Sequence, residues 1–253
     1  MILRSITKHL KDQNWFAVGL DFFIVVVGVF LGIQVANWNE EQAFNDRETE
    51  LLYDLKKETQ NSILLTNNKI DSYAQVTAAG KRSLNFISRN ASCGSECWPV
   101  LVDFMHASQW QGVQVPRSVY DSMRRNGLPK DGAIVEAVEA YLAQNYAAVL
   151  ATTTLPYYGD VIRQLLSVET QEFYWRNCFS LLDGVENYDV NCPKGVADDI
   201  ALKAVEDILQ NTEIKPHLTQ WISMTTVVPI ALINQNDRAE QAIAAIDAEL
   251  ERR

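Results

Sequence analysis

A single apolar run near the N-terminus limits what this chain can form more than any other feature of its sequence. Residues 16–36 are apolar or small apart from Asp21 and Gln34, and they contain no lysine or arginine. A hydrocarbon core of about 30 Å needs roughly 20 helical residues at about 1.5 Å each, and this run supplies them. Cleaved signal peptides have shorter apolar regions, of about 7–15 residues, and Gln34-Val35-Ala36 is a poor cleavage site. We therefore predict a transmembrane helix over residues 16–36 that is retained as a signal anchor.

Charged and aromatic residues at the two ends of this run indicate its orientation. Three basic residues precede the run, whereas the first basic residue after it is Arg47. Because basic flanks stay in the cytoplasm, residues 1–15 are predicted to be a short cytoplasmic stub and residues 37–253 to lie across the membrane. Trp15 and Trp38 stand where indole rings prefer the headgroup layers, and are predicted interfacial anchors. The sequence thus predicts a single-pass membrane protein with its C-terminal domain outside the cytoplasm, which for a protein of a bacterial inner membrane is the periplasm.

All four cysteines lie in the part predicted to be periplasmic, at Cys93, Cys97, Cys178 and Cys192. An even number of cysteines in an oxidising compartment favours disulfides, although four cysteines allow three pairings. The most economical pairing is local, Cys93 with Cys97 and Cys178 with Cys192. A metal or redox site at Cys93 and Cys97 is the weaker alternative, because three residues separate them and no histidine is near. We predict no metal and no cofactor.

The composition of the predicted periplasmic part favours helices. Glycine and proline are sparse and gather at a few points, and strict alternation of apolar and polar residues is hard to find. The predicted fold class is all-α, with one N-terminal transmembrane helix that continues into an elongated helical-bundle periplasmic domain. Prolines and the Asn126-Gly127 and Asp183-Gly184 pairs divide the chain into predicted helices over residues 39–89, 99–105, 117–125, 131–150, 156–183, 196–210 and 216–253, the last with a kink at Pro229.

The net charge of −10 argues against nucleic-acid binding. Residues 1–36 carry three positive and two negative charges (+1), which leaves −11 on the rest of the chain. Such a surface repels phosphate backbones and anionic headgroups. Phosphate-loop, dinucleotide-binding, zinc-protease and nucleophile-elbow motifs are all absent from the sequence, so we predict no enzymatic activity and no catalytic residue. His106, close to Asp103 in the sequence, is interpreted as part of a solvated surface pair.

Asp21 is the most unusual residue of the predicted span, because an acid at the centre of a membrane helix costs about 2.5–3.5 kcal/mol on insertion scales. Gly28 and Gly32 follow it at steps of seven and four residues, and Ala36 continues the same ridge. Small residues at this spacing let membrane helices approach closely. We predict a helix–helix contact over Asp21, Gly28, Gly32 and Ala36. The alternative is ordinary membrane composition, with Asp21 hydrated near the cytoplasmic interface.

Arginines and aromatic residues offer a further, weaker site. On an acidic helical protein, arginines more often pair with local carboxylates than with a ligand. Whether the domain binds a small molecule is left open by the sequence. The residues of this possible anion-binding patch are Arg124, Arg125, Arg163 and Arg176, with Tyr157, Tyr158 or Trp175.

Part of the chain resembles a known family. The segment from Asp21 through Gly28 and Gly32 to Asn37-Trp38-Asn39-Glu40 resembles the start of an uncharacterised family of bacterial single-pass membrane proteins, in which an acid-opened span precedes Asn-x-Trp-Asn-Glu. Residues 47–55 resemble its continuation and residues 119–127 a later block. Family members usually have Gly-Glu where this chain has Leu20-Asp21. The resemblance implies a single-pass inner-membrane protein with a helical outer domain, and it carries no assigned activity.

Three hypotheses of function follow. The leading one is a non-enzymatic membrane protein whose periplasmic domain serves protein interaction or assembly. Its partners would be the lipid bilayer and another membrane protein, or a second copy of itself, through the transmembrane helix. The second is a periplasmic ligand-sensing module that signals through its membrane helix. The third is an ion- or proton-coupled membrane subunit that uses Asp21.

Overall fold

The structure, a computed structural model, describes residues 15–153 and 156–253, with side chains from Gly19 onward. These residues form an almost entirely helical protein, which confirms the predicted all-α class. The chain divides into two units, Met1–Leu51 and Leu52–Arg253, and helix α2 contributes to both. The elements in chain order are α2 (Trp15–Ser88), α3 (Cys97–Ala107), α4 (Ser118–Arg125), α5 (Gly132–Thr152), α6 (Tyr157–Gln164), α7 (Val168–Asn177), β1 (Phe179–Leu182), β2 (Val185–Tyr188), α8 (Asp198–Gln210) and α9 (Ile214–Arg252).

The first unit contains the apolar run, which is helical throughout its described part. Near the N-terminus the described chain has one helix long and apolar enough to cross a membrane, and none of its most apolar 18-residue window is buried. Phe22, Val25 and Phe30, for example, are 70%, 62% and 59% exposed. The predicted cytoplasmic stub and the Trp15 side chain lie outside the described residues.

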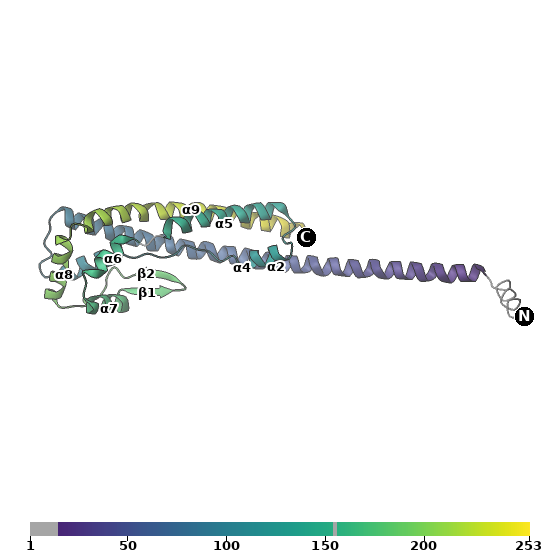
Figure 1. Cartoon of the computed structure of the whole chain (residues 1–253), viewed down its shortest axis with the longest axis horizontal. Helices are drawn as coiled ribbons and strands as arrows, with labels where there is room; N and C mark the ends of the chain where they lie inside the picture. The colour runs from purple at the N-terminus through teal and green to yellow at the C-terminus, as the bar shows by residue number, and fades with distance from the viewer. Residues whose placement is uncertain (1–14, 154–155) are drawn as a thin grey trace, which may run out of the picture. The chain divides into compact units, whose positions relative to one another are not determined.

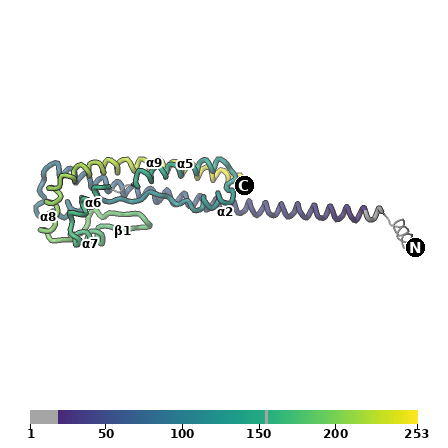
Figure 2. The backbone as a smooth tube through the Cα atoms, viewed as in Figure 1, coloured from purple at the N-terminus to yellow at the C-terminus, as the bar shows by residue number. Residues whose placement is uncertain are grey.

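The second unit is organised around three long helical segments, the later part of α2 together with α5 and α9 (Figures 1 and 2). Helix α9 runs antiparallel to both of its neighbours. Its buried Gln235 accepts a hydrogen bond from Asn145 of α5 at 2.8 Å and donates one to Thr66 of α2 at 3.2 Å. A second contact joins α2 to α9 nearer the N-terminal end of α9, where the Thr77 hydroxyl donates a hydrogen bond to the Thr225 hydroxyl at 2.8 Å. A buried amide that is satisfied on both sides fixes the register of the three helices.

Local sequence signals account for several helix ends. Asp131 caps α5, as its position predicts, because its carboxylate accepts a hydrogen bond from the backbone N–H of Ala133 at 2.7 Å. Gly127 follows α4 with a φ of 73°, a left-handed conformation that glycine adopts without steric cost. Helix α9 continues through Pro229, and the kink predicted there stays a prediction.

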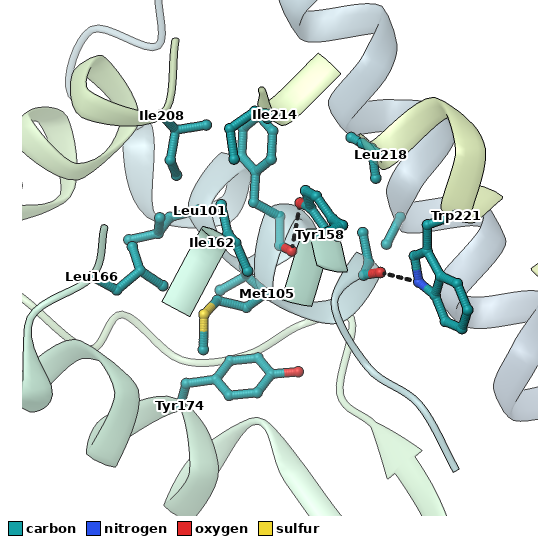
Figure 3. Packing of buried hydrophobic residues seen from close by; sticks show 14 of the residues in the cluster. Leu101, Met105, Tyr158, Ile162, Leu166, Tyr174, Ile208, Ile214, Leu218 and Trp221 are labelled. Carbon is teal, nitrogen blue, oxygen red and sulfur yellow. Dashed lines mark hydrogen bonds between the residues drawn. The ribbon is translucent and has the colours of Figure 1, made fainter. Parts of the chain in front are cut away.

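The main hydrophobic core lies between the short helices and the start of α9 (Figure 3). The buried residues that Figure 3 labels come from α3, α6, α7, α8 and α9 and from the segments that join them. Two hydrogen bonds complete this packing. The Tyr158 hydroxyl donates to the Phe104 carbonyl at 3.0 Å, and the Trp221 indole donates to the Ala107 carbonyl at 2.8 Å. The C-terminal half of α3 is therefore held by both α6 and α9.

A β-hairpin interrupts the helical domain, and the helix predicted over residues 156–183 is wrong. Helix α6 ends at Gln164, α7 ends at Asn177, and β1 then pairs with β2 in antiparallel register. Asp183 and Gly184 form its turn, with φ values of 50° and 79°. A two-residue turn with positive φ at both positions matches the twist of a hairpin and favours Asp-Gly. The pair that was interpreted as a helix end is therefore a hairpin turn.

Both disulfides have the predicted local pairing. The Cα atoms of Cys93 and Cys97 lie 4.8 Å apart, and those of Cys178 and Cys192 lie 4.9 Å apart. The first bridge closes the turn before α3. The second joins the residue after α7 to the segment after β2, so it closes the chain around the hairpin. Cys178 is fully buried.

Candidate functional site

The hairpin brings polar side chains against the helices, and these side chains make the candidate site. Hydrogen bonds of its backbone hold strand β2 in place. The backbone N–H of Tyr188 donates to the Gln75 amide oxygen of α2 at 3.3 Å, and that of Glu186 donates to the Gln111 amide oxygen at 3.4 Å. Ser72 of α2 donates its hydroxyl to the Glu186 carbonyl. These bonds set the position of the Glu186 and Tyr188 side chains.

His106 lies in the interior beside the hairpin, so its interpretation as a solvated surface residue is wrong. It is 1% exposed, and its Nε2 lies 2.9 Å from the Asp189 carbonyl oxygen. Because a carbonyl only accepts, Nε2 carries the ring proton, and Nδ1 accepts from the Tyr174 hydroxyl at 2.7 Å. Asp103, the expected partner of His106, instead accepts from the Arg82 guanidinium at 2.8 Å.

Burial controls protonation in this region. It raises the pKa of the Tyr174 and Tyr188 hydroxyls well above the usual range, so both remain hydrogen-bond donors at neutral pH. Tyr188 donates to the carboxylate of Glu186. Burial also raises the pKa of Glu186, while its hydrogen bond from Tyr188 and the charge of Arg163 act in the opposite direction. Glu186 is thus a half-buried acid with a neighbouring cation.

Acidification is expected to destabilise the domain through His106. Burial lowers the pKa of His106 below 6.5, against the hydrogen bond to Asp189, so the unfolded chain binds more protons than the folded one as the pH falls through about 6.5. The stabilising contribution of the neutral ring is complete above that pH and is lost below it. The melting temperature should therefore fall between about pH 7.5 and about pH 5.5. Circular dichroism melting curves measure this.

The His106→Gln variant is the control for that experiment. Glutamine keeps polar atoms in the same place but does not titrate. Glu186 contributes a pH dependence of stability with the opposite sign to that of His106. Because its pKa is raised in the folded state, it adds stability as the pH falls towards 4.5. The difference between the wild-type and variant curves isolates the contribution of the histidine. Parallel curves for the two proteins would contradict the assignment.

A cavity of about 220 Å³ lies where α6, α7 and β2 meet the end of α3. Arg163 lines it, with its guanidinium carbon 5.7 Å from the centre of the Trp175 ring. The guanidinium donates one long hydrogen bond, of 3.4 Å, to the Ser108 carbonyl, and its Nε is buried without a hydrogen bond. The full lining is Ser108, Gln109, Trp110, Pro156, Gly159, Asp160, Arg163, Trp175 and Glu186.

This cavity contains side chains of both charges that do not form an ion pair with each other. Over residues 15–153 and 156–253, no ion pair within 4.0 Å includes Arg163 or Glu186. The arrangement provides a guanidinium stacked near an indole and a carboxylate held by a tyrosine. It can therefore bind groups of opposite charge on one small molecule. No group of three or more His, Cys, Asp or Glu side chains is placed to hold a metal ion in the described part of the chain.

The four-arginine patch that the sequence suggested is not formed. Arg163 and Trp175 do line one cavity, but Arg176 pairs with Glu172 of its own helix at 3.6 Å. Arg124 and Arg125 lie on α4, towards the other end of the helical unit from α6 and α7 (Figure 1), and Tyr158 is buried in the core. Arg163 is therefore the one arginine of the predicted patch that lines this cavity. Glu186, which completes the cavity, was not predicted.

The residues predicted to contact another membrane helix are all exposed, as is Trp38. Apart from the glycine itself, its two chain neighbours and the adjacent backbone of its own helix, no atom lies within 4 Å of where a Cβ would stand on Gly28 or Gly32. The small-residue face is therefore open over the described chain, and its role stays a prediction. The face comprises Asp21, Gly28, Gly32 and Ala36.

A scan against protein-family models, a search of curated proteins and a search of solved structures each found no match to this chain. The resemblance of residues 20–55 to an uncharacterised family of membrane proteins remains a proposal.

Proposed function

We propose that this protein is a single-pass inner-membrane protein whose disulfide-bonded helical domain lies in the periplasm and serves protein interaction or assembly. In this proposal residues 16–36 span the bilayer with the N-terminus in the cytoplasm. The membrane helix also associates with another membrane helix, from a second copy or from a partner. The domain carries no catalytic role.

The observation that carries the proposal is the exposure of the apolar helix. Leu20, Ile24 and Leu31 are 49%, 58% and 56% exposed, and their neighbours along the span are exposed to a similar degree. Leaving that much apolar surface in water costs about 25 cal/mol for each Å², whereas a bilayer removes the cost. A long helix that is apolar on all sides and has nothing packed on it is typical of a membrane span.

The disulfides and the charge support a periplasmic domain. Bridges of this kind persist in oxidising compartments and are rare in the cytosol. Both bridges lie in the part of the chain beyond the apolar helix. The net charge of −11 on residues 37–253 keeps that domain away from anionic headgroups and favours a solvated position.

Helix association is expected to depend on Gly28. A leucine there would stand on the open small-residue face and keep a second helix away, because such contacts need the backbones to approach closely. Gly28→Leu should weaken association of the full chain in detergent by several-fold. Light scattering at a series of protein concentrations measures the oligomer mass.

Gly19→Leu is the matched control for this experiment. Gly28 lies nine positions after Gly19, which places the two about 180° apart around the helix at about 3.6 residues per turn. Gly19→Leu adds the same side chain to the opposite face and should leave association unchanged. Equal oligomer mass for the wild type and Gly28→Leu would show that this face is not an interface.

A further inference from the structure

We propose that the cavity between α6, α7 and β2 binds a small zwitterion that carries one carboxylate and one ammonium group, as a free amino acid does. This site belongs entirely to the helical unit Leu52–Arg253. It goes beyond the function proposed above, and it does not depend on the membrane anchor. Binding of such a ligand would give the domain a sensing role.

Arg163 provides the anionic half of this recognition. Arg163 lines the cavity, and the only hydrogen bond described for its guanidinium is the long one, of 3.4 Å, that it donates to the Ser108 carbonyl. A carboxylate is the acceptor that fits a planar guanidinium best, because it can accept two parallel hydrogen bonds. The Trp175 ring beside the guanidinium holds it towards the cavity.

Glu186 provides the cationic half. Its side chain lines the same cavity, and its position is set by the hydrogen bond from Tyr188 and by the backbone bond to Gln111. A carboxylate has acceptor sites beyond the one that Tyr188 uses, and an ammonium group has three donors to offer. An ammonium group in the cavity would hence find an acceptor of opposite charge.

The presence of both charges decides the class of ligand. A simple anion would be attracted by Arg163 and repelled by the ionised carboxylates of Glu186 and Asp160, which also line the cavity, whereas a simple cation would meet the reverse. Direct pairing of the two residues would remove the need for a ligand, but the described chain shows no such ion pair. A zwitterion satisfies both groups at once.

The volume limits the size of the ligand. A cavity of about 220 Å³ holds the volume of about seven waters, at about 30 Å³ each. Sites for drug-sized molecules occupy about 300–1,000 Å³. An amino acid of small or medium size therefore matches the volume of this cavity.

Titration calorimetry on the full chain in detergent tests this proposal. The probes are glycine, L-alanine, L-serine and L-glutamine, with acetate and ethylamine as compounds that carry one charge each. At least one amino acid should bind, and acetate and ethylamine should each bind at least tenfold more weakly. The absence of heat from all four amino acids at millimolar concentration would overturn the proposal, as would equal binding of acetate.

Charge-removing variants identify the residues responsible. Arg163→Gln should weaken amino-acid binding at least tenfold, whereas Arg176→Gln, which removes an exposed arginine of α7, should not change it. Glu186→Gln should also weaken amino-acid binding but should strengthen binding of acetate, because the repulsion by the Glu186 carboxylate is removed while Asp160 is unchanged. Loss of folding would weaken the binding of amino acids and of acetate alike, and it cannot strengthen the binding of acetate. Glu186→Gln therefore tests the site even if Arg163→Gln lowers the melting temperature of the domain. Unchanged amino-acid binding in folded Arg163→Gln, or unchanged acetate binding in Glu186→Gln, would refute the assignment.

Discussion

Replacing Trp221 with alanine is expected to lower the free energy of unfolding of the helical domain by about 3–5 kcal/mol, the usual cost of removing a buried tryptophan. Trp221 is 8% exposed, packs at the junction of α3, α6 and α9, and donates its indole N–H to the Ala107 carbonyl at 2.8 Å (Figure 3). Alanine leaves both a cavity and an unpaired carbonyl. Urea unfolding of the full chain, followed by circular dichroism, measures the change.

Two further variants separate the causes. Trp221→Phe keeps a buried ring but removes the hydrogen bond and a small part of the ring volume, so it should cost about 1–2 kcal/mol. Met224→Ala lies on the same helix but is 41% exposed, and surface changes of this kind usually remain within about 0.5 kcal/mol. A loss below about 1 kcal/mol for Trp221→Ala would mean that α9 does not hold α3 in the way described.

Removing the Cys178–Cys192 disulfide is expected to cost about 3 kcal/mol. The bridge joins residues 14 positions apart, and closing a loop of about that length removes this much conformational entropy from the unfolded chain. The double variant Cys178→Ala, Cys192→Ala avoids placing a polar group at the buried position of Cys178. Because the bridge encloses the hairpin, the same variant should weaken the contacts that place Glu186 in its cavity.

The other disulfide provides a matched comparison. Cys93 and Cys97 are four positions apart, so the same relation gives a smaller stabilisation of about 2 kcal/mol. A reducing agent should lower the free energy of unfolding of the wild type to that of a variant without either bridge, and it should leave the stability of that variant unchanged. Urea unfolding with and without the reducing agent measures both values. A Cys178→Ala, Cys192→Ala variant as stable as the wild type would contradict a structural role for this bridge.

The helices could be predicted from the sequence because their signals are local. Apolar residues repeat with a helical period along α2, α5 and α9, and Asp131 and Gly127 stand at helix ends where capping chemistry favours them. The disulfide pairing could also be predicted from local sequence, because each cysteine pairs with the cysteine nearest to it along the chain. The helix that failed is the one predicted over residues 156–183, which breaks between Gln164 and Val168 and ends at Asn177, before the Asp183-Gly184 pair. That pair is a signal for a helix end and for a hairpin turn alike, and no alternating strand pattern decided between them.

The candidate site could be predicted only in part, because it depends on contacts between distant parts of the chain. Arg163 and Trp175 were singled out in the sequence, whereas Glu186 was not. Arg163 and Glu186 meet only after the hairpin has docked on α2, through the bonds of Ser72 and Gln75 to β2. The burial of His106 has the same origin, since its partner carbonyl belongs to Asp189, 83 residues away. The Asp-Gly turn was the one sequence signal that could have indicated the hairpin. The cavity itself has no sequence motif.

Protease accessibility in spheroplasts tests most directly the central claim that residues 16–36 anchor the chain in the inner membrane with the domain outside. The account predicts that a C-terminal epitope on the full chain sediments with membranes, resists alkaline extraction and disappears when protease is added to intact spheroplasts. A cytoplasmic marker should survive the same treatment. An epitope that stays protected until the spheroplasts are lysed, or one found in the soluble fraction, would contradict the account.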